Sequence, residues 1–535
     1  MMSRTCIDRI VLGVVVGVFG FPGGIWGQER PGAGEAVPLD RYEVGTALPP
    51  QDPGRELVTL TLDQAIERAL ERNLDVQTAR LAPRMQQFSL QAARAAFTPT
   101  LNGNYGYNSS TNQSTSQLDG GARTTTERHT VNTSITQTVP WYGGRLGLGF
   151  NNSRTSTNNA FSTLNPSYRS TVSLDYTQPL LSGLRTDNQR AALQTEEIRG
   201  RITEIQLDAR VQNITEDVRR AYWGLRAAIE QIEIQRRNLA QAEQLLADNQ
   251  VRVRLGTMAQ IQVVQAEAQV AAAQQSLLNA EIQWRNQELV LKSLLISGAD
   301  DPLLYQTVDP VELPTIQDQA VDIQSAIQVA LSERTDIRQL RQERRVAEID
   351  LDVTRDSRLP DLDLTASYSL LGVGGTQYDR SGLGGSAVLV EEGGYLDGLN
   401  SIAGLDAPTW NVGVSFSYPI GMRTAKANLE RARLQMEQRD LAIRSQELAI
   451  VTEVTNAGLA VTDTRLQLDA ATRSRELAEE SAAAEVTRFN AGVATNFEVV
   501  AAQDALTSAR LSELRAIIEH VNAIAEFERV QSVGR

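Results

Sequence analysis

Hydrophobic and polar positions along the chain follow two periods, and the same succession of periods occurs twice. Apolar residues spaced three and four apart predict helices, alternating apolar and small polar residues then predict strands, and a long helical stretch that ends at glycine follows. The first copy starts at Leu62 and passes Tyr107, and the second starts at Ile323 and passes Tyr368, at a constant offset of 261 residues. Self-similarity over this length predicts one architectural unit used twice.

Long helices are predicted by apolar residues in alternating steps of three and four. The series are Val211, Ile214, Val218, Ala221, Leu225, Ala228 and Ile232 in the first copy, and Ile450, Val454, Ala457, Val461, Thr464, Leu468 and Ala471 in the second. Such a heptad seam predicts left-handed supercoiling against another helix. At 1.5 Å per residue, each stretch of roughly 70 residues would be about 100 Å long. We expect these helices to pack side by side in a bundle or tube.

Strands of about ten residues are predicted at six places. These are 99–109, 130–139, 145–156 and 169–179 in the first copy, and 361–371 and 410–420 in the second. One face is apolar and the other small and polar, as where Val412, Val414 and Phe416 alternate with Gly413 and Ser415. A membrane β-barrel wall needs this pattern, and a soluble β-sandwich is the alternative. In lipid every backbone polar group must be paired, so only a closed barrel fits. Six strands are too few to close one, which implies oligomerisation.

Proline and glycine punctuation gives the expected boundaries. They are a signal peptide at 1–27, an extended tail at 28–56, a first repeat at 57–298 (helices 57–98 and 185–298, strands 99–179), a linker at 299–319, and a second repeat at 320–535 (helices 320–358 and 422–530, strands 360–420). The Gly-rich stretch from Gly372 to Ala407 is predicted to be a long external loop. The expected fold class is mainly α with a membrane β part.

The N-terminus has the features of a secretory signal peptide. Arg4 and Arg9 precede an apolar run from Ile10 to Phe21, which is too short to span a bilayer as a helix. Cleavage is expected after Gly27, and an uncleaved anchor is the alternative. The only cysteine of the sequence precedes the apolar run, so we expect no disulfide in the mature chain.

Composition argues against several classes of function. The net charge of -14 disfavours nucleic acid as a partner, because binding phosphates requires a basic surface. The two histidines, His129 and His520, lie too far apart in sequence for metal-ligand or catalytic-triad spacing. We therefore expect no enzymatic activity, no cofactor and no metal site.

These features together resemble the TolC family of outer-membrane efflux and secretion ducts, from Leu60 to Val530. The resemblance rests on the repeated Ala-Ile-x-x-Ala-Leu helix start and on prolines at equivalent strand ends, which are Pro99, Pro360, Pro179 and Pro419. It implies a homotrimer whose protomers share one transmembrane β-barrel in the outer membrane. Long coiled-coil helices would form a periplasmic α-barrel continuous with it.

The resemblance also implies a function. The chain would be the outer-membrane channel component of a tripartite efflux pump or a type I secretion system. It would be a passive duct in the lipid bilayer, opened at its periplasmic tip by an adaptor protein and served by an inner-membrane transporter of the RND, ABC or MFS type. A non-conducting periplasmic coiled-coil scaffold and a surface adhesin are the alternatives.

The turn after each long helix is the most specific motif. At an offset of 236 residues, Arg252 and Gly256 of the first copy match Arg488 and Gly492 of the second. Glycine ends a helix in the left-handed conformation at the least cost, so two ordinary glycine caps are the alternative reading. By resemblance, the two turns, with Phe489 beside Arg488, form the periplasmic tip that contacts the adaptor.

The same resemblance assigns Gln262, Ala494 and Glu498 to the entrance constriction. The best-known member has an acidic residue and an arginine at the first two positions, and that pair helps to hold the entrance shut. Gln262 and Ala494 cannot form it, so we hypothesise a higher basal conductance. Three copies of Glu498 around an axis would favour cations. The alternative is a solvated carboxylate that complements the helix dipole.

An extra hairpin distinguishes the first copy from the usual family plan of four strands per protomer. The first strand region exceeds the second by 21 residues, which matches a hairpin at 130–156 that turns between Trp141 and Gly144. A trimeric barrel would have eighteen strands if this hairpin joins the wall and twelve if it folds elsewhere. The sequence leaves both possibilities open.

Overall fold

The computed structural model describes residues 47–51, 54–114, 121–313, 321–380, 382 and 385–531. The chain divides into two units, Met1–Glu43 and Val44–Arg535, and all the described residues lie in the second. The predicted signal peptide at 1–27 and the predicted tail up to residue 46 lie outside the described residues.

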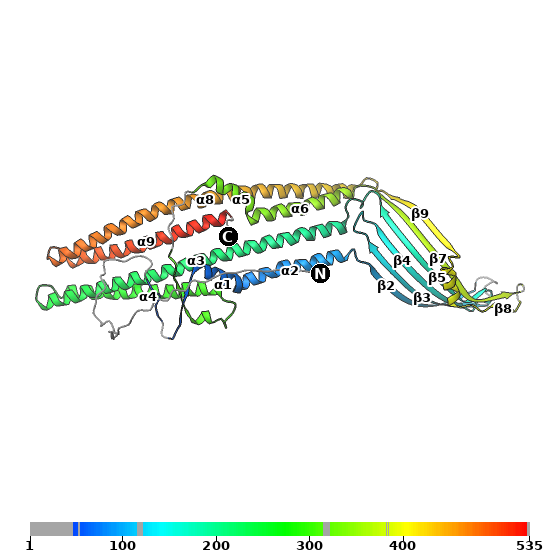
Figure 1. Ribbon diagram of the computed structural model, residues 1–535, viewed down its shortest axis with the longest axis horizontal. Coiled ribbons are helices and arrows are strands. Elements are labelled where there is room, and N and C mark those ends of the chain that lie inside the picture. Colours follow the sequence, from blue (N-terminus) through cyan, green and yellow to red (C-terminus); the bar gives the residue numbers. More distant parts are fainter. Residues whose placement is uncertain are drawn as a thin grey trace, which may run out of the picture. The chain divides into compact units, whose positions relative to one another are not determined.

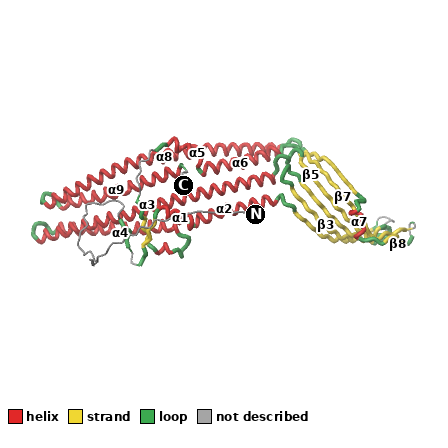
Figure 2. Tube along the Cα trace, viewed as in Figure 1, coloured by secondary structure: helices red, strands yellow, loops and turns green. Residues whose placement is uncertain are grey.

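Helices lying side by side make up most of the second unit (Figure 1, Figure 2). Their bounds are α1 (Leu62–Arg72), α2 (Leu74–Ala95), α3 (Asn188–Arg254), α4 (Ile261–Leu295), α5 (Ile323–Glu333), α6 (Thr335–Asp356), α7 (Tyr395–Ala403), α8 (Arg423–Asn490) and α9 (Asn496–Val530). Near the strands the packing order is α2-α3-α6-α8, and further away α3 and α8 pack on α4 and α9. The helices within the described ranges include none with the length and apolar content needed to cross a bilayer.

The predicted heptad seams are the buried faces of the long helices. On α3, Val218 and Leu225 are 0% exposed, and on α8 Ile450 and Val454 are 0% exposed. Each seam packs against the short helix whose Ala-Ile-x-x-Ala-Leu start recurs in the sequence. The alanines of that motif are buried at these contacts, and they are Ala65, Ala69, Ala326 and Ala330. The motif therefore lets α1 and α5 approach the long helices closely.

Seven strands form one sheet within the described part of the chain. They are β2 (Thr100–Gln113), β3 (Arg123–Thr138), β4 (Arg145–Thr157), β5 (Leu164–Pro179), β7 (Asp361–Arg380), β8 (Ala387–Glu391) and β9 (Pro408–Ser417). The six long strands lie in the order β2-β3-β4-β5-β7-β9 with every pair antiparallel, and β8 joins the far end of β7. All lie at one end of the helices (Figure 1). Among the described strands, β2 and β9 each pair on one side only.

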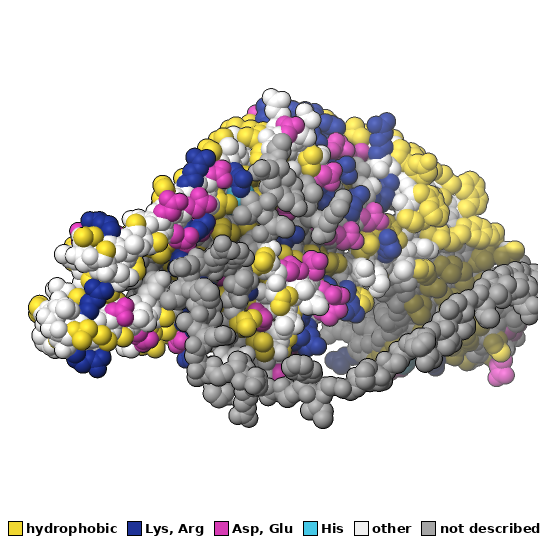
Figure 3. Space-filling view, turned by 60° about the vertical axis from the view of Figure 1, so that its left-hand side comes forward, with side chains coloured by type: hydrophobic (Ala, Val, Ile, Leu, Met, Phe, Trp, Pro, Cys, Tyr) yellow, Lys and Arg dark blue, Asp and Glu magenta, His cyan; other side chains and the backbone are white. Residues whose placement is uncertain are grey.

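The register gives this sheet one apolar face and one polar face. One row of paired residues reads Leu101, Ile135, Leu148, Leu174, Tyr368 and Trp410, and its neighbour on the other face reads Asn102, Ser134, Gly149, Ser173, Ser369 and Thr409. The apolar side chains are exposed, with Leu101 at 69% and Trp410 at 74%. Figure 3 shows hydrophobic side chains gathered over the sheet, whereas charged side chains are scattered over the helices. The predicted alternation thus extends across all six long strands.

The extra hairpin lies inside this sheet. β3 pairs with β2 and β4 pairs with β5 over most of their lengths. Val139 donates its N–H to the Gly144 carbonyl oxygen (2.7 Å), so residues 140–143 form a four-residue loop, in which Tyr142 and Gly143 have positive φ angles of 58° and 69°. The predicted turn is confirmed, and in this chain the hairpin belongs to the wall of strands.

The prediction of a helix from residue 57 is wrong over its first residues. Leu57–Leu60 forms a strand, β1, which pairs in parallel with β6 (Thr307–Pro310). The linker predicted at 299–319 therefore contains regular structure, including the short helix η2 (Pro302–Tyr305). This two-stranded ladder keeps the chain extended until Thr61, whose side chain caps α1.

The prediction of a long loop from Gly372 to Ala407 is also wrong. β7 continues to Arg380, and β8 and α7 follow. Gly372 lies on the same face of β7 as Tyr368, which is the apolar face. A Cβ at Gly372 would overlap the carbonyl oxygen of Gly398 in α7. Glycine on both elements lets the helix lie directly on the strand.

A buried carboxylate lies where η2 meets α1. The Asp301 carboxylate, 2% exposed, accepts from Arg68 (Nη2 to Oδ1, 2.6 Å), Arg72 (Nη1 to Oδ2, 3.0 Å) and the Leu303 N–H (3.0 Å). Burial alone would raise the pKa of the Asp301 carboxyl, but these three donors outweigh it and lower the pKa below its ordinary value. Asp301 thereby fixes the segment after α4 onto the first repeat.

Candidate functional site

The candidate site is the pair of helical turns farthest from the sheet, where α3 meets α4 and α8 meets α9 (Figure 1). Gly256 and Gly492 have φ angles of 75 and 77, so both predicted left-handed glycines are confirmed. In each turn the residue after the glycine donates its N–H to the carbonyl oxygen five positions back, from Thr257 to Arg252 (2.9 Å) and from Val493 to Arg488 (3.0 Å). The two turns therefore have the same backbone geometry.

The two tip arginines have different contacts, although they occupy equivalent positions. Arg252 reaches across to the end of α8, where it donates to the Phe489 carbonyl oxygen (3.3 Å) and to Asn490 Oδ1 (3.0 Å). Its guanidinium also lies 4.2 Å from the centre of the Phe489 ring. Arg488 instead pairs with Glu485 (2.5 Å), one turn back on its own helix. The helices α3 and α4 form one helical hairpin, and α8 and α9 form the other. Arg252 therefore joins the two helical hairpins, whereas the ion pair of Arg488 stays within one helix.

Phe489 is the centre of a small apolar cluster between the hairpins. It is 5% exposed and packs with Leu245 of α3 and Val499 of α9. Met258 and Ala494, from the two turns, cover this cluster. Phe489 and Ala494 thus serve to hold the hairpins together in this chain.

Polar side chains add further links just above the turns. Asn249 of α3 donates to Asn496 of α9 (Nδ2 to Oδ1, 3.0 Å), and both side chains are buried. Gln269 of α4 donates to Asp504 of α9 (Nε2 to Oδ1, 2.9 Å). A buried amide pair has few alternative partners, so separating the hairpins would leave Asn249 and Asn496 to be solvated by water.

Glu498 lies in the first turn of α9, where its side chain completes a capping box. Its Oε2 accepts from the N–H (2.6 Å) and the hydroxyl (3.0 Å) of Thr495, whose hydroxyl oxygen accepts from the Glu498 N–H (3.4 Å). These Thr495 donors lower the pKa of the exposed Glu498 carboxyl. Gln262 lies at the equivalent start of α4, partly exposed.

A set of exposed apolar side chains at the same turns was not predicted from the sequence. They are Leu255 (72% exposed), Ile261 (61%), Val493 (67%) and Phe497 (77%). Ile261 and Phe497 occupy equivalent positions, and each is the first residue or the second of its helix, α4 or α9. Their repetition at the offset of 236 residues was the signal available in the sequence.

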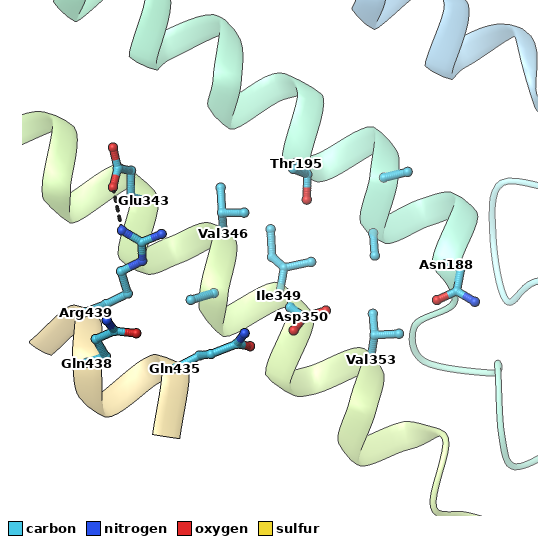
Figure 4. Close-up of a pocket in the computed structure, with 13 residues that line it drawn as sticks. Asn188, Thr195, Glu343, Val346, Ile349, Asp350, Val353, Gln435, Gln438 and Arg439 are labelled. Carbon is cyan, nitrogen blue, oxygen red and sulfur yellow. Dashed lines mark hydrogen bonds and ion pairs between the residues drawn. The ribbon is translucent and has the colours of Figure 1, made fainter. Parts of the chain in front are cut away.

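A hollow of about 480 Å³ lies elsewhere, among α3, α6 and α8 close to the sheet. Arg439 of α8 and Glu343 of α6 form an ion pair at one end of it (2.9 Å, Figure 4). Val346, Ile349 and Val353 of α6 also line it. This mixture of apolar and paired charged groups is typical of packing between helices. The described residues include no cluster of three or more potential metal ligands.

Comparison with known proteins agrees with this architecture. The sequence profile of the outer membrane efflux protein family matches residues 65–295 and 326–525, whereas no curated protein matches the chain. The fold is similar to the Campylobacter jejuni CmeC outer membrane channel (15% identity, 88% of this chain and 85% of that chain, TM-score 0.62). It is also similar to the Vibrio cholerae outer membrane protein VceC (15% identity, 88% of this chain and 95% of that chain, TM-score 0.61). A third similar structure is the open state of the Neisseria gonorrhoeae MtrE channel (19% identity, 88% of this chain and 88% of that chain, TM-score 0.57). Because the profile covers most of both repeats, the chain belongs to the outer membrane efflux protein family, and its long helices extend into the periplasm.

Proposed function

We propose that this chain is the outer-membrane channel of a tripartite efflux pump or a type I secretion system. In this proposal it works as a homotrimeric, passive duct that an adaptor protein opens at the helical turns. An inner-membrane transporter of the RND, ABC or MFS type would supply the energy. The observation that carries the proposal is the six-stranded two-faced sheet with two unpaired edges.

The apolar face of the sheet argues for lipid contact. Trp410, Val412, Val414 and Phe416 of β9 are all more than 60% exposed, and they lie on one face. A soluble scaffold or an adhesin would expose this patch to water, which favours aggregation. In a bilayer the same face is matched to lipid, provided that the edges β2 and β9 are paired. The two neighbouring copies in a trimer supply the missing partners, one at each edge.

The helices carry a matching surface for a second copy. Outward-facing apolar residues recur every seven positions on α2 and on the first half of α8. They are Leu74 (56% exposed), Leu81 (49%) and Phe88 (68%) on α2, and Leu434 (65%), Leu441 (56%) and Leu448 (69%) on α8. The two helices run in opposite directions relative to the sheet, so Leu81 would face Leu441 when Phe88 faces Leu434. Two such stripes form a coiled-coil seam between copies.

The repeat of the chain gives the same alignment independently. Within one chain, α3 of the first repeat contacts α6 of the second, where Gln206 donates to Gln339 (3.4 Å). Adding the offset of 236 to Gln206 gives Ala442 of α8, and subtracting the offset of 261 from Gln339 gives Thr78 of α2. The equivalent contact between copies therefore places Ala442 of one copy opposite Thr78 of the next. This lies within one helical turn of the pairing of Leu441 with Leu81. The internal contact and the exposed stripes therefore support one mode of assembly.

The exposed turns suit a docking surface for the adaptor. Ile261 and Phe497 present similar apolar side chains at equivalent positions, and the half-exposed side chain of Arg488 adds a positive charge near Glu498. An adaptor hairpin that buries these side chains would gain hydrophobic stabilisation. Binding would favour an open arrangement only if the adaptor contacts that arrangement better than the closed one.

Because Gln262 and Ala494 cannot form a charge pair, closure of the entrance in this proposal depends on other links. Arg252, Asn249 and the Phe489 cluster join the two hairpins of one chain. The absence of the charge pair still predicts a higher basal conductance than in a member that has it. Recordings of the Gln262→Asp and Ala494→Arg double variant test this, and an unchanged conductance would count against it.

The proposed function is tested by reconstituting the purified mature protein into planar bilayers. We expect a detergent-extracted trimer that inserts and conducts ions. A monomer that stays in solution without detergent and leaves the bilayer silent would instead favour the scaffold. Recovery of the protein from the culture medium would favour the adhesin. Co-purification from membranes, with identification of the adaptor and transporter, then separates the pump from the secretion system.

A further inference from the structure

The β3–β4 hairpin continues the apolar and polar faces of the wall without interruption. Ile135 of β3 and Leu148 of β4 stand between Leu101 of β2 and Leu174 of β5 in one row of paired residues. Adjacent positions on these strands, such as Ser134 and Gly149, face the other way. A hairpin folded outside or inside a barrel would have lost this register.

We propose that the hairpin enlarges the shared barrel to eighteen strands, and that β9 of each copy closes it on β2 of the next. The inference rests on the proposed trimer, and it assigns the duct an exit about one and a half times as wide as four strands per copy would give. The partner at each open edge is a second copy of this chain, and the pore wall is incomplete without it.

The strand directions permit this closure. The six long strands alternate in direction from β2 to β9, because every neighbouring pair is antiparallel. With an even number of strands, β9 of one copy also runs opposite to β2 of the next. Antiparallel pairing then continues around the whole barrel, as membrane barrels of this type require.

The repeat predicts which residues meet at the joint. Within the chain, β5 at the end of the first repeat pairs with β7 at the start of the second, with Leu174 opposite Tyr368. Pro179 at the end of β5 is equivalent to Pro419 after β9, and Pro360 before β7 is equivalent to Pro99 before β2. The pairing of β5 with β7 therefore predicts how β9 of one copy pairs with β2 of the next. Phe416 then lies opposite Tyr105, and Val414 lies opposite Tyr107.

This register keeps the faces of the wall continuous. Phe416 and Tyr105 both belong to the apolar face, and they are 67% and 66% exposed. A register shifted by one residue would place an apolar side chain of one copy beside a polar one of the next. All ten residues of β9 would find partners on β2, between Asn104 and Gln113.

The width of the sheet also matches the helices beneath it. Four helices, α2, α3, α6 and α8, lie side by side next to the strands. With axes ~8–10 Å apart they span about 36 Å. Six strands ~4.8 Å apart and tilted by ~40° span about 38 Å of circumference, whereas four would span about 25 Å. Six strands per copy therefore continue the helix layer with nearly the same circumference.

The consequence is a wide exit with a polar lining. An eighteen-stranded barrel with this spacing and tilt has a backbone radius of about 18 Å, against about 12 Å for twelve strands. The row Asn102, Ser134, Gly149, Ser173, Ser369 and Thr409 faces the lumen in this arrangement. Arg128, Arg169, Asp175 and Asp363 lie on the same face, so acidic and basic side chains are mixed with the amides, hydroxyls and glycine, and neither sign of charge dominates. The barrel would admit bulky cargo, so the cargo would be selected at the helical turns.

Cysteine cross-linking tests the joint in the full-length chain. We would use a Cys6→Ser background with Phe416→Cys and Tyr105→Cys together, and Leu441→Cys with Leu81→Cys as the matched pair in the helices. Disulfide-linked trimers from both pairs support the proposal. Helix cross-links without strand cross-links would overturn it while leaving the trimer intact. If neither pair cross-links, the proposed trimer fails, and the eighteen-stranded barrel fails with it.

Deleting the hairpin tests the width of the exit. Removing Arg123–Thr157 leaves β2 and β5 as antiparallel neighbours and four strands per copy. For a variant that still gives helix cross-links, polymer exclusion from the extracellular side of a bilayer should show the exit cross-section falling to about half. An unchanged size limit would overturn the proposal. If the variant does not assemble, a disulfide between Leu101→Cys and Ile135→Cys in the full-length chain tests whether β3 lies beside β2 in the wall, and its absence would overturn the proposal.

Discussion

Replacing Arg252 with alanine should loosen the closed tip. In the structure Arg252 of α3 binds the Phe489 carbonyl oxygen, the Asn490 side chain and the Phe489 ring, all at the end of α8. Opening of the duct separates these two hairpins in the proposed mechanism, so all three contacts exist only in the closed arrangement. Arg252→Ala removes them and leaves the helices and the glycine turn unchanged.

The size of the effect follows from these contacts. A partly exposed cation over an aromatic ring contributes about 0.5–1 kcal/mol. The two hydrogen bonds from the guanidinium add about 1 kcal/mol in this partly solvated position. A total of about 1.5–2 kcal/mol corresponds to a roughly tenfold or larger shift of the closed-to-open ratio for each protomer. With one such contact in every copy, the resting open probability of a trimer should rise markedly.

Arg488→Ala is the matched control. Arg488 occupies the equivalent position, but it is 51% exposed and its ion pair with Glu485 stays within α8. Exposed pairs of this kind contribute about 0.3–0.5 kcal/mol, which is a factor of about two. Arg252→Lys keeps the charge and loses the planar fork, so its effect should lie between those of the wild type and Arg252→Ala.

The assay is single-channel recording in planar bilayers at fixed salt and voltage. Each variant is first checked for trimer formation and thermal stability in detergent. We expect frequent openings of Arg252→Ala without adaptor, and nearly wild-type gating of Arg488→Ala. The reasoning is refuted if both variants gate like the wild type. It is also refuted if the two arginine variants open equally, since then the contacts across the hairpins would have no special role.

Other expected outcomes concern the entrance, the wall and the junction near α1. Glu498→Lys should reduce or invert cation preference in bilayer conductance, and unchanged selectivity would remove a Glu498 ring from the mechanism. Val414→Arg should destabilise the inserted barrel by about 2–4 kcal/mol, whereas Ser415→Arg on the other face should be tolerated, as compared by urea unfolding in lipid vesicles. Asp301→Asn should cost about 1–3 kcal/mol at neutral pH. Because the folded pKa of Asp301 is lowered, its contribution is present above the unfolded pKa of about 4, and the difference from the variant should vanish as the pH falls through the folded pKa.

The elements that the sequence predicted are those whose pattern is local. The long helices and six strands appear where heptad spacing and alternation predicted them, because each pattern records burial on one side of a regular element. The left-handed glycines Gly256 and Gly492 were predictable because few other residues adopt that conformation cheaply. The turn at Gly143 was predictable for the same reason, whereas the positive φ angle of Tyr142 beside it was not.

The missed elements depend on contacts between distant segments. β1 and β6 are four residues long, and Leu57–Leu60 is extended only because Thr307–Pro310 pairs with it. α7 has nine residues and lies on β7 through glycine contacts that leave no periodic trace. The contact of Arg252 with Asn490 joins residues 238 positions apart, and no spacing rule predicts it.

The tip shows how a duplicated backbone can carry unequal chemistry. At the repeat offset, Phe489 corresponds to Val253 and Asn490 to Arg254. The end of α8 therefore offers a ring and an amide to an arginine, and the end of α3 offers neither. Because Arg252 has these partners within its own chain, joints inside a subunit differ in strength from joints between subunits. A closed entrance built from three copies then has threefold symmetry in its energetics, although its helices approach sixfold symmetry. The effect of Arg252→Ala should accordingly be distributed over three joints, which is why a change of about 1.5 kcal/mol in each can alter the gating of the whole duct.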